Sequence, residues 1–298
     1  MPRIGAHMSV AGGLPLAIAR ARIHRCEAMQ IFTKNANQWR ARPLGPEEIA
    51  SFRRAAVESG IHPIVSHASY LINVATTNPV LRSQSLAALI EEVDRAEALG
   101  LLGVVLHPGS RMAASEDEAV ALVARALTDV LRARPRGKTM ILLEHTAGQG
   151  TAMGATFEQI AAMLDGVRSR KRLGVCLDTC HLLASGYDIC SEEGYRRAFE
   201  RFDALIGFER LKVFHLNDSK KPCQSRVDRH EHIGKGCIGL EPFRRLVNDA
   251  RFNHLPMLIE TEKTETRVKG DSMRMLPDPL DVMNLDTLRS LRTNNQKL

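Results

Sequence analysis

The sequence predicts an α/β protein in which eight strand–helix units close into a single-domain (β/α)8 barrel, a TIM barrel. Short apolar runs rich in Val, Ile and Leu recur eight times in the 298 residues, and longer amphipathic stretches separate them. The runs are continuous rather than alternating, which is typical of parallel strands covered on both faces. The length also fits a barrel of about 250 residues with insertions. An open doubly wound sheet is the alternative fold.

Local patterns place the predicted strands and helices. Proline and acidic residues open the helix at Pro43–Gly60, and glycine ends it. Ser115 with Glu118, and Thr156 with Gln159, have the spacing of capping boxes and begin two more helices. Other helices are predicted at Pro79–Gly100, Glu192–Gly207 and Leu240–Phe252. The strands are predicted at Ile4–His7, Ala28–Thr33, Ile61–Ser66, Gly103–His107, Thr139–Glu144, Leu173–Asp178, Leu211–His215 and Pro256–Glu260.

No linker and no shift in composition divides the chain, so one domain is expected. Residues 1–262 are predicted to form the barrel. Residues 263–298 are predicted to form a C-terminal tail. In this tail a polar loop at 263–279 precedes a final helix at 281–292 and a frayed end at 293–298.

Composition limits the function classes. The chain has 41 Lys and Arg against 34 Asp and Glu, a net charge of +7. This charge supports two interpretations about equally: a polyanionic partner such as nucleic acid, or a basic surface that only aids solubility. Aromatic residues make up only 4%, which argues against a stacking platform for single strands. Because the sequence has no membrane-length apolar run and no signal peptide, we expect a cytoplasmic protein with reduced cysteines and no membrane partner.

Six predicted strands end at, or next to, a side chain that can bind a metal ion. In a barrel the carboxyl ends of all strands meet in one mouth, where barrel enzymes place their active sites. A buried carboxylate or imidazole is costly unless it is paired or bound to a metal, and a metal cluster satisfies all six at once. These residues are His67, His107, Glu144, Asp178, His215 and Glu260.

Three further residues are expected in the same mouth. His181 follows Asp178 by three positions, and Asp228 and His230 alternate on the loop after the seventh strand. The nine side chains offer nitrogen and oxygen atoms, which suit zinc or manganese better than calcium or magnesium. Nine ligands are too many for one tetrahedral zinc, so two or three metals are expected. Adjacent metals are the standard device for phosphodiester hydrolysis.

Other conspicuous residues are assigned structural roles. Gly234, Gly236 and Gly239 spell GxGxxG, but the segment before them is polar, so a tight turn beside the metal loop is favoured over a nucleotide site. Cys176 and Cys180 lack zinc-knuckle spacing and are expected to pack in the core. His24, His62 and His254 are expected to be exposed. His7, His145 and His232 are expected to lie beside the ligands or at the surface.

Several stretches resemble the endonuclease IV family of apurinic/apyrimidinic (AP) endonucleases, which act in base-excision repair. Its three signature stretches are similar to HASYLIN (67–73), LGVCLDTCHLLASGYD (173–188) and HLNDSKKPCQSRVDRHEHIGKG (215–236). Its other blocks are similar to IGAHMSVAGG (4–13), FTKNANQW (32–39), HPGS (107–110) and TAGQG (146–150). The resemblance runs from residue 4 to about residue 260, which is nearly the whole chain.

The resemblance implies a TIM barrel with three metal ions, usually zinc, with Mn²⁺ an alternative at one or more sites. All nine ligand positions match. By resemblance, the first metal is held by His67 and His107, and Glu144 bridges the first and second. The second metal is completed by Asp178, His215 and Glu260, and the third is held by His181, Asp228 and His230.

The implied reaction is hydrolysis of the phosphodiester 5′ to an abasic site by a metal-bridging hydroxide. It leaves a 3′-hydroxyl and a 5′-deoxyribose phosphate, and blocked 3′ ends are also trimmed. The implied partner is double-stranded DNA with abasic sites or blocked 3′ ends. Tyr70 and Leu71 match wedge positions that replace lost stacking as the abasic nucleotide flips out.

Two positions depart from the family pattern. Asn37, which we assign to DNA binding, stands where better-known members carry an arginine that enters the base stack. His145 stands where asparagine is expected after Glu144. A monomer is expected. Two alternative functions are a sugar isomerase or epimerase of the related barrels, which needs one or two metals, and a non-catalytic binder of damaged DNA.

Overall fold

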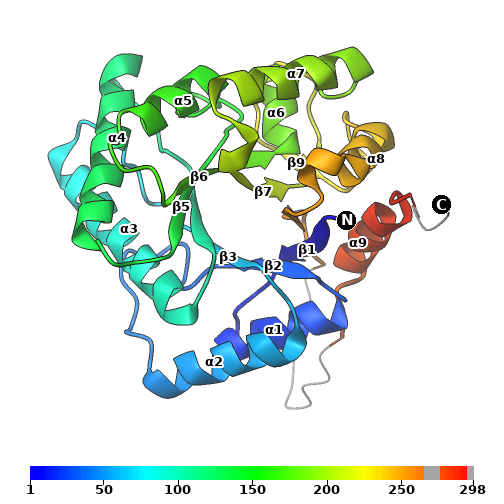
Figure 1. Ribbon diagram of the computed structural model, residues 1–298, viewed down its shortest axis with the longest axis horizontal. Helices are drawn as coiled ribbons and strands as arrows, with labels where there is room; N and C mark the ends of the chain where they lie inside the picture. The colour runs from blue at the N-terminus through cyan, green and yellow to red at the C-terminus, as the bar shows by residue number, and fades with distance from the viewer. Residues whose placement is uncertain (265–275, 294–298) are drawn as a thin grey trace.

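Eight parallel strands close into a barrel in the computed structural model, which describes residues 1–264 and 276–293 (Figure 1). Neighbouring strands pair in sequence order, and the last of them pairs with the first. The prediction of a closed barrel is confirmed, and the open doubly wound sheet is excluded. The strands are β1 (Arg3–His7), β2 (Ala28–Ile31), β3 (Ile64–His67), β4 (Gly103–Leu106), β5 (Met140–Glu144), β6 (Leu173–Asp178), β7 (Leu211–His215) and β10 (Pro256–Ile259).

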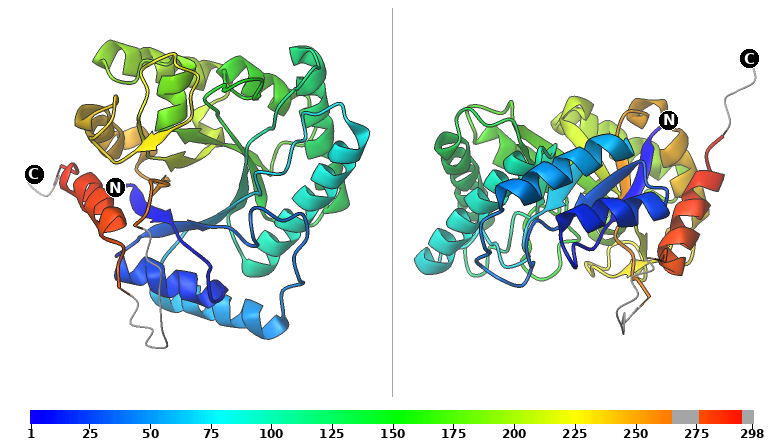
Figure 2. Two further views of the ribbon diagram at one scale, coloured as in Figure 1. Left: turned by 180° about the vertical axis from the view of Figure 1, so that it is seen from behind. Right: turned by 90° about the horizontal axis from the view of Figure 1, so that it is seen from below.

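Helices surround the barrel in an outer ring (Figures 1 and 2). They are α1 (Leu14–Ile23), α2 (Pro46–Ser59), α3 (Pro79–Leu99), α4 (Glu116–Ala133), α5 (Phe157–Asp165), α7 (Glu192–Leu205), α8 (Leu240–Asn248) and α9 (Pro279–Ser290). Two 3-10 turns at Phe208–Arg210 and Ala250–Phe252 complete the connections. Among the described residues, no helix has both the length and the apolar character needed to cross a bilayer.

Two small elements that the sequence patterns did not predict lie at the carboxyl ends of the strands. The short helix α6 (Thr179–Ser185) follows β6 directly. A two-stranded antiparallel hairpin, β8 (Asp218–Ser219) with β9 (His230–Glu231), follows β7. The side view in Figure 2 places this yellow hairpin and the N-terminus on opposite faces of the barrel. Both elements therefore belong to the mouth in which the candidate ligands were expected.

The predicted capping residues act as helix starts. The Ser115 hydroxyl accepts a hydrogen bond from the Glu118 amide, and the Thr156 hydroxyl accepts one from the Gln159 amide, each at 3.2 Å. The Gln159 side chain reaches further back than a capping box requires. It accepts hydrogen bonds from the amides of Gly154 and Ala155, so it also fixes the loop that leads into α5.

The barrel interior contains one apolar layer. Seven strands each contribute one fully buried residue to it, namely Ala28, Val65, Val105, Leu142, Cys176, Val213 and Leu258. β1 contributes Gly5, which stands opposite Ala28 on one side and Leu258 on the other. A larger cluster of apolar residues fills the space between the strands and the helices. The core therefore has two parts, one inside the barrel and one between the strands and the surrounding helices.

The final helix packs on the barrel next to β1 (Figure 1). The Arg292 guanidinium pairs with Glu27 at 2.6 Å, and the Arg289 guanidinium donates to the backbone oxygens of His24 and Arg25. The division of the chain at residue 262 stays a prediction. All but the first residue of the frayed end expected at 293–298, and most of the loop expected at 263–279, lie outside the described residues.

The prediction that His24 is exposed was wrong, because this side chain is buried. Its Nε2 accepts a hydrogen bond from the Asp278 amide at 2.8 Å, so the histidine ties α1 to the start of α9. His62 and His254 are exposed, as expected.

Substituting Gly5 tests the tightness of the barrel. A Cβ atom at this position would lie 1.8 Å from the Ala28 carbonyl oxygen and 3.2 Å from Leu258. We expect Gly5→Ala to lower the free energy of unfolding in urea by at least about 3 kcal/mol, because backbone must move to admit the methyl group. Gly45→Ala is the matched control, since nothing lies within 4 Å of its Cβ position. Equal stabilities of the two variants would contradict the packing described here.

Candidate metal centre

A layer of polar side chains lies directly above the apolar layer. Side chains two positions apart on a strand point to the same face, so each interior residue is followed by another that points into the mouth. The residues two positions beyond the apolar layer are His7, Gln30, His67, His107, Glu144, Asp178, His215 and Glu260. All six strand-end ligand candidates belong to this layer, and strand geometry therefore explains why they converge.

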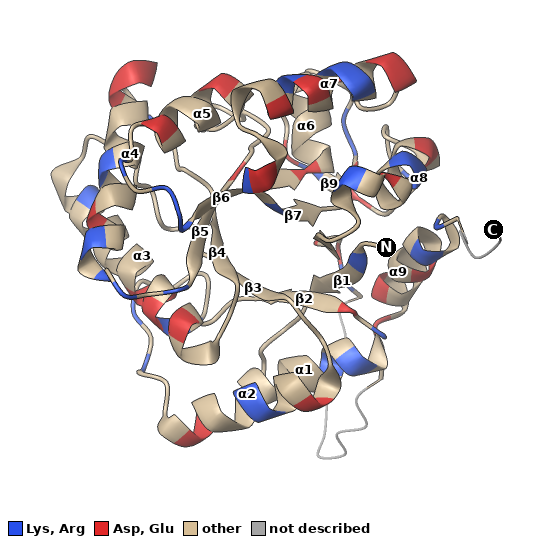
Figure 3. Ribbon diagram, in the orientation of Figure 1, with Lys and Arg blue, Asp and Glu red and all other residues tan. Residues whose placement is uncertain are grey.

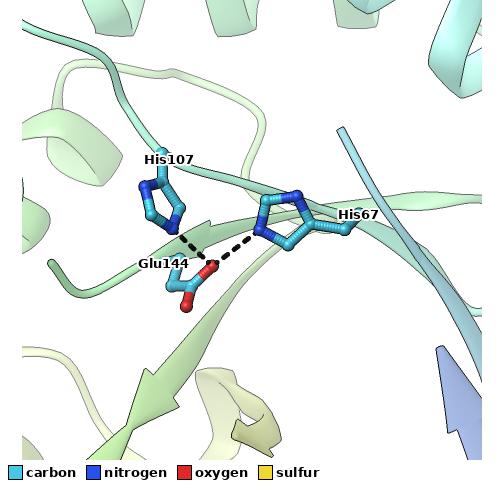
Figure 4. A group of neighbouring side chains, drawn as sticks. All are labelled: His67, His107 and Glu144. Carbon is cyan, nitrogen blue, oxygen red and sulfur yellow. Dashed lines mark hydrogen bonds and ion pairs between the residues drawn. The ribbon is translucent and has the colours of Figure 1, made fainter. Parts of the chain in front are cut away.

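His67, His107 and Glu144 form the first group of candidate ligands (Figure 4). Nε2 of each histidine lies 3.1 Å from Oε2 of Glu144. Nδ1 of His67 donates to the Ala68 carbonyl at 2.7 Å, which fixes the tautomer and leaves the lone pair of Nε2 directed at the mouth. The three donor atoms are therefore arranged around one point.

Glu144 also belongs to a second group, with Asp178, His215 and Glu260. Its other oxygen, Oε1, lies 2.9 Å from Nδ1 of His215, and that nitrogen is 3.2 Å from Oε2 of Glu260. Nε2 of His215 contacts the side-chain oxygen of Gln30 at 2.9 Å, so the histidine presents Nδ1 to the group. The two oxygens of Glu144 thus face different groups, which is the arrangement a bridging carboxylate needs.

The third group contains His181 from α6, and Asp228 and His230 from the β8–β9 hairpin. Nε2 of His181 lies 3.1 Å from Asp228, and Nε2 of His230 lies 3.3 Å from Asp228 and 3.6 Å from Asp178. The structure brings all nine candidate ligands into one mouth, with Asp178 next to both the second and the third group.

Two buried nitrogen atoms in the third group indicate that it fits a cation. Nε2 of His181 and Nε2 of His230 are shielded from solvent, and among the described residues neither makes a hydrogen bond of good geometry, although the Asp228 carboxylate lies 3.1 and 3.3 Å from them. Nδ1 of His181 contacts the His145 carbonyl at 2.8 Å, which assigns the proton to Nδ1. A buried imidazole nitrogen with a free lone pair is costly unless it binds something, and a metal ion satisfies it. The nitrogen and oxygen donors suit zinc or manganese.

Opposite charges shift the pKa values in the mouth. Burial alone lowers the pKa of His181, but the neighbouring Asp178 and Asp228 carboxylates outweigh it and raise that pKa to about 10. The pKa of His230 is likewise raised, to about 9, against the effect of burial. Burial opposes ionisation of Glu144, yet His215 and His107 hold its pKa well below the usual range. Without metal the mouth is thus an ion-pair network, and a bound cation takes the place of protons on these imidazoles.

The glycine-rich loop after β9 binds a carboxylate of the protein itself. The Asp218 side chain is fully buried and accepts hydrogen bonds from the backbone amides of Gly234, Gly236, Ile238 and Gly239, at 2.8 to 3.3 Å. The GxGxxG pattern is therefore a tight turn closed around Asp218, and a nucleotide phosphate has no place there. This turn anchors the hairpin that carries Asp228 and His230.

Several supporting residues gave no recognisable signal of their own. Asn217 donates to Asp178 at 2.6 Å and accepts from the Glu260 amide at 2.8 Å, so it orients two candidate ligands. His7 and Gln30 both contact Glu260. His7 was expected beside the ligands, and its contact with Glu260 agrees with that prediction. Gln30 could be identified only from its position two residues beyond the apolar layer, which requires knowing the strand register.

His145 lies behind the mouth and does not reach the candidate ligand atoms. Burial lowers its pKa to about 3, so the imidazole is neutral at physiological pH. Its Nε2 contacts the Ala155 carbonyl at 3.1 Å. The departure from asparagine at this position therefore introduces no charge next to Glu144.

The three proposed DNA contacts lie on two loops at the rim of the mouth. Tyr70 is exposed, and its ring packs edge-on against Phe32 and tilts against His67. Leu71 is half-buried and Asn37 is exposed. A cavity of about 210 Å³ beside the first group is lined in part by Tyr70 and His107.

A buried glutamate holds these two rim loops together. Glu92 of α3 accepts hydrogen bonds from the Thr33 hydroxyl at 2.8 Å and from the Ser69 amide at 3.3 Å. The Lys34 ammonium lies 3.8 Å from Glu92 and donates to the Trp39 carbonyl. The loop that contains Asn37 and the loop that contains Tyr70 therefore share one anchor.

Gly236→Ala tests whether the Asp218 turn positions the third group. A Cβ atom on Gly236 would lie 2.4 Å from the Ser219 carbonyl oxygen and 2.5 Å from Asp218. We expect the variant to bind one metal ion fewer per chain than the wild type, measured by elemental analysis after dialysis against zinc. Lys235→Ala, which removes an exposed side chain in the same turn, should bind as many ions as the wild type. An unchanged metal content in Gly236→Ala would show that the turn does not support the third group.

Comparisons with known proteins identify the family to which the chain belongs. A family model described as a xylose isomerase-like TIM barrel matches residues 18–278. A relative named "Probable endonuclease 4" from Chloroflexus aurantiacus is 49% identical over 291 residues, 98% of each chain.

Solved structures agree with this result. The structure of endonuclease IV from Thermus thermophilus has a TM-score of 0.83 and 34% identity, and the match covers 97% of this chain and 98% of that chain. A D-tagatose 3-epimerase-like protein has a TM-score of 0.71, covers 97% and 96% of the two chains, and is 17% identical, so it shares the fold alone. The chain therefore belongs to the endonuclease IV family of xylose isomerase-like TIM barrels.

Proposed function

We propose that the protein is a metal-dependent AP endonuclease of DNA base-excision repair. It hydrolyses the phosphodiester 5′ to an abasic site, leaves a 3′-hydroxyl and a 5′-deoxyribose phosphate, and trims blocked 3′ ends. The observation that carries this proposal is the set of nine nitrogen and oxygen ligands in one mouth, where Glu144 lies between two groups of donors. Membership of the endonuclease IV family supports the same reaction class, a nuclease and therefore a hydrolase.

Three metal ions, with zinc as the expected species, fit the three groups. His67, His107 and Glu144 would hold the first ion, and Glu144 would also bind the second. Asp178, His215 and Glu260 would complete the second, and His181, Asp228 and His230 would hold the third. When bound, such ions lower the pKa of water and neutralise charge on the phosphate oxygens.

The side chains of the mouth orient the candidate ligands. Glu144 is fully buried, so its charge acts at low dielectric on the groups on either side of it. The carbonyls of Ala68 and His145 fix the tautomers of His67 and His181. Gln30 and Asn217 fix the directions of Glu260, His215 and Asp178. These contacts place the donor atoms before any substrate arrives, which is what catalysis by preorganisation requires.

Double-stranded DNA is the proposed partner, with Tyr70, Leu71 and Asn37 as its rim contacts. Unstacking costs least where a base is already missing, and an inserted side chain offsets part of that cost. Tyr70 is suited to such a wedge because it is exposed while its ring rests on Phe32 and His67. Asn37 can offer hydrogen bonds but, being short, little stacking area. The expected monomer and cytoplasmic location stay predictions.

The two alternative functions differ from this proposal at specific residues. A sugar isomerase or epimerase with one or two metals has no need of the third group, whose buried His181 and His230 nitrogens make no hydrogen bond among the described residues. A non-catalytic DNA binder has no chemical need for any of the nine ligands. Substituting the first and the third group separately therefore distinguishes the three functions.

Incision of a labelled duplex with one tetrahydrofuran abasic analogue tests the proposal. Because the analogue cannot undergo β-elimination, a cut must be hydrolytic. We expect the zinc-loaded wild type to cut on the 5′ side and leave a 3′-hydroxyl. Glu144→Ala and His181→Ala should each lose at least about 10³-fold in single-turnover rate, because transition-state charge loses its stabilisation.

His254→Ala is the control, since this exposed histidine lies away from the mouth, and its rate should equal that of the wild type. No incision by the zinc-loaded wild type would refute the proposal. Full activity of His181→Ala would refute the three-metal form of it and favour a two-metal enzyme.

A further inference from the structure

The positive charge of the chain is concentrated in two loops. The segments 132–138 (RARPRGK) and 168–172 (RSRKR) contain eight Lys and Arg residues and no Asp or Glu. The net charge of the whole chain is +7, so the remaining residues carry a net charge of −1. The basic character that favours a polyanionic partner therefore comes entirely from these loops. We name them together the basic face.

The basic face lies at the opposite end of the barrel from the metal centre. Its two loops lead directly into β5 and β6 at Met140 and Leu173, whereas Glu144 and Asp178 stand at the other ends of these strands. β6 has six residues, which corresponds to about 20 Å of strand. Figure 3 shows the same two loops in blue where they enter β5 and β6. A duplex engaged at the mouth therefore does not neutralise this charge.

Two adjoining cavities form a groove across the basic face. One of about 670 Å³ is lined by the end of α4 and by residues 167–172, and the other, of about 470 Å³, extends to the start of β7 at Arg210 and Lys212. Arg168, Arg170 and Lys171 line both. The groove is thus elongated, with cations along its length and one carboxylate, Glu209, at the β7 end, where it pairs with Arg210.

Most of the Lys and Arg side chains of the basic face are available to a ligand. Arg134 pairs with Asp94, and Arg170 pairs with Asp165. In the described part of the chain, no carboxylate lies within 4.0 Å of Arg132, Arg136, Lys138, Arg168 or Lys171, and all five are exposed. The helix dipole does not explain them, because the last turn of α4 contains only Arg132 and that of α5 contains no basic residue.

We propose that the basic face binds the phosphodiester backbone of a second DNA duplex, separate from the one in the mouth. Arginine-rich, elongated and exposed surfaces match a row of phosphates, and binding releases counterions from the DNA. No aromatic side chain lines the groove, which disfavours base stacking and therefore single strands. The surface gives sequence-independent affinity and lets one molecule bridge two DNA segments.

The test uses the zinc-loaded full chain and the double variant Arg168→Gln/Lys171→Gln. The matched control is Arg22→Gln/Arg54→Gln, which removes two exposed arginines of α1 and α2 that have no carboxylate within 4.0 Å in the described chain. The affinity for a labelled undamaged duplex is measured against KCl concentration. We expect the salt slope of the basic-face variant to fall by about 1.8, or roughly 0.9 for each lost phosphate contact. The control should keep the wild-type slope.

A second arm detects bridging by energy transfer between a donor-labelled abasic-analogue duplex and an acceptor-labelled undamaged duplex. Wild type and control should give energy transfer at low KCl concentration, and the basic-face variant should lose it while its incision rate on a short abasic-analogue duplex stays at the wild-type value. The salt arm does not involve the metal centre, so its outcome is independent of the proposed function. A salt slope of the variant equal to that of the wild type would overturn the proposal. It would favour an acidic protein, rather than DNA, as the partner of the basic face. Bridging that persists in the variant would overturn it too.

Discussion

The structure of the mouth depends on the need to neutralise Glu144. This carboxylate is fully buried at the end of β5, where an unpaired charge is strongly disfavoured. Imidazoles surround it on two sides, with His67 and His107 near one oxygen and His215 near the other. The register of the strands fixes the position of each of these histidines. The fold of the barrel therefore also sets which charges surround Glu144. Divalent cations held on both sides of Glu144 would neutralise it, and they would bind the same imidazole nitrogens that carry protons in their absence.

The loops around the mouth are held by buried carboxylates that do not face the candidate metals. Asp218 closes the glycine-rich turn and thereby fixes the hairpin with Asp228 and His230. Glu92 joins the two rim loops with Tyr70 and Asn37. In both cases at least one backbone amide donates to a buried acid, which pairs the acid and orders the loop at the same time. Loops ordered in this way would need little further ordering when they bind the proposed DNA substrate.

Much of the fold and of the candidate site could be predicted from the sequence. Continuous apolar runs indicated the eight strands, and the residues at their ends indicated a common mouth, since parallel strands in a barrel end together. Gln30 and Asn217 could not be identified, because amides have no distinctive pattern and their roles depend on exact register. The burial of His24 depends on α9, whose start at Asp278 is 254 positions away in the chain. The position of the charge was also missed, because a net charge of +7 does not reveal which face of the barrel carries it.

The proposed function requires that the nine residues form one centre in which Glu144 is shared between two metals. X-ray diffraction from crystals of the zinc-loaded protein, recorded on both sides of the zinc absorption edge, tests it most directly. We expect three anomalous peaks in the mouth, each within about 2.3 Å of its ligand atoms, with the two oxygens of Glu144 bound to two different peaks. One or two peaks in total, or three peaks of which fewer than two contact Glu144, would contradict this arrangement.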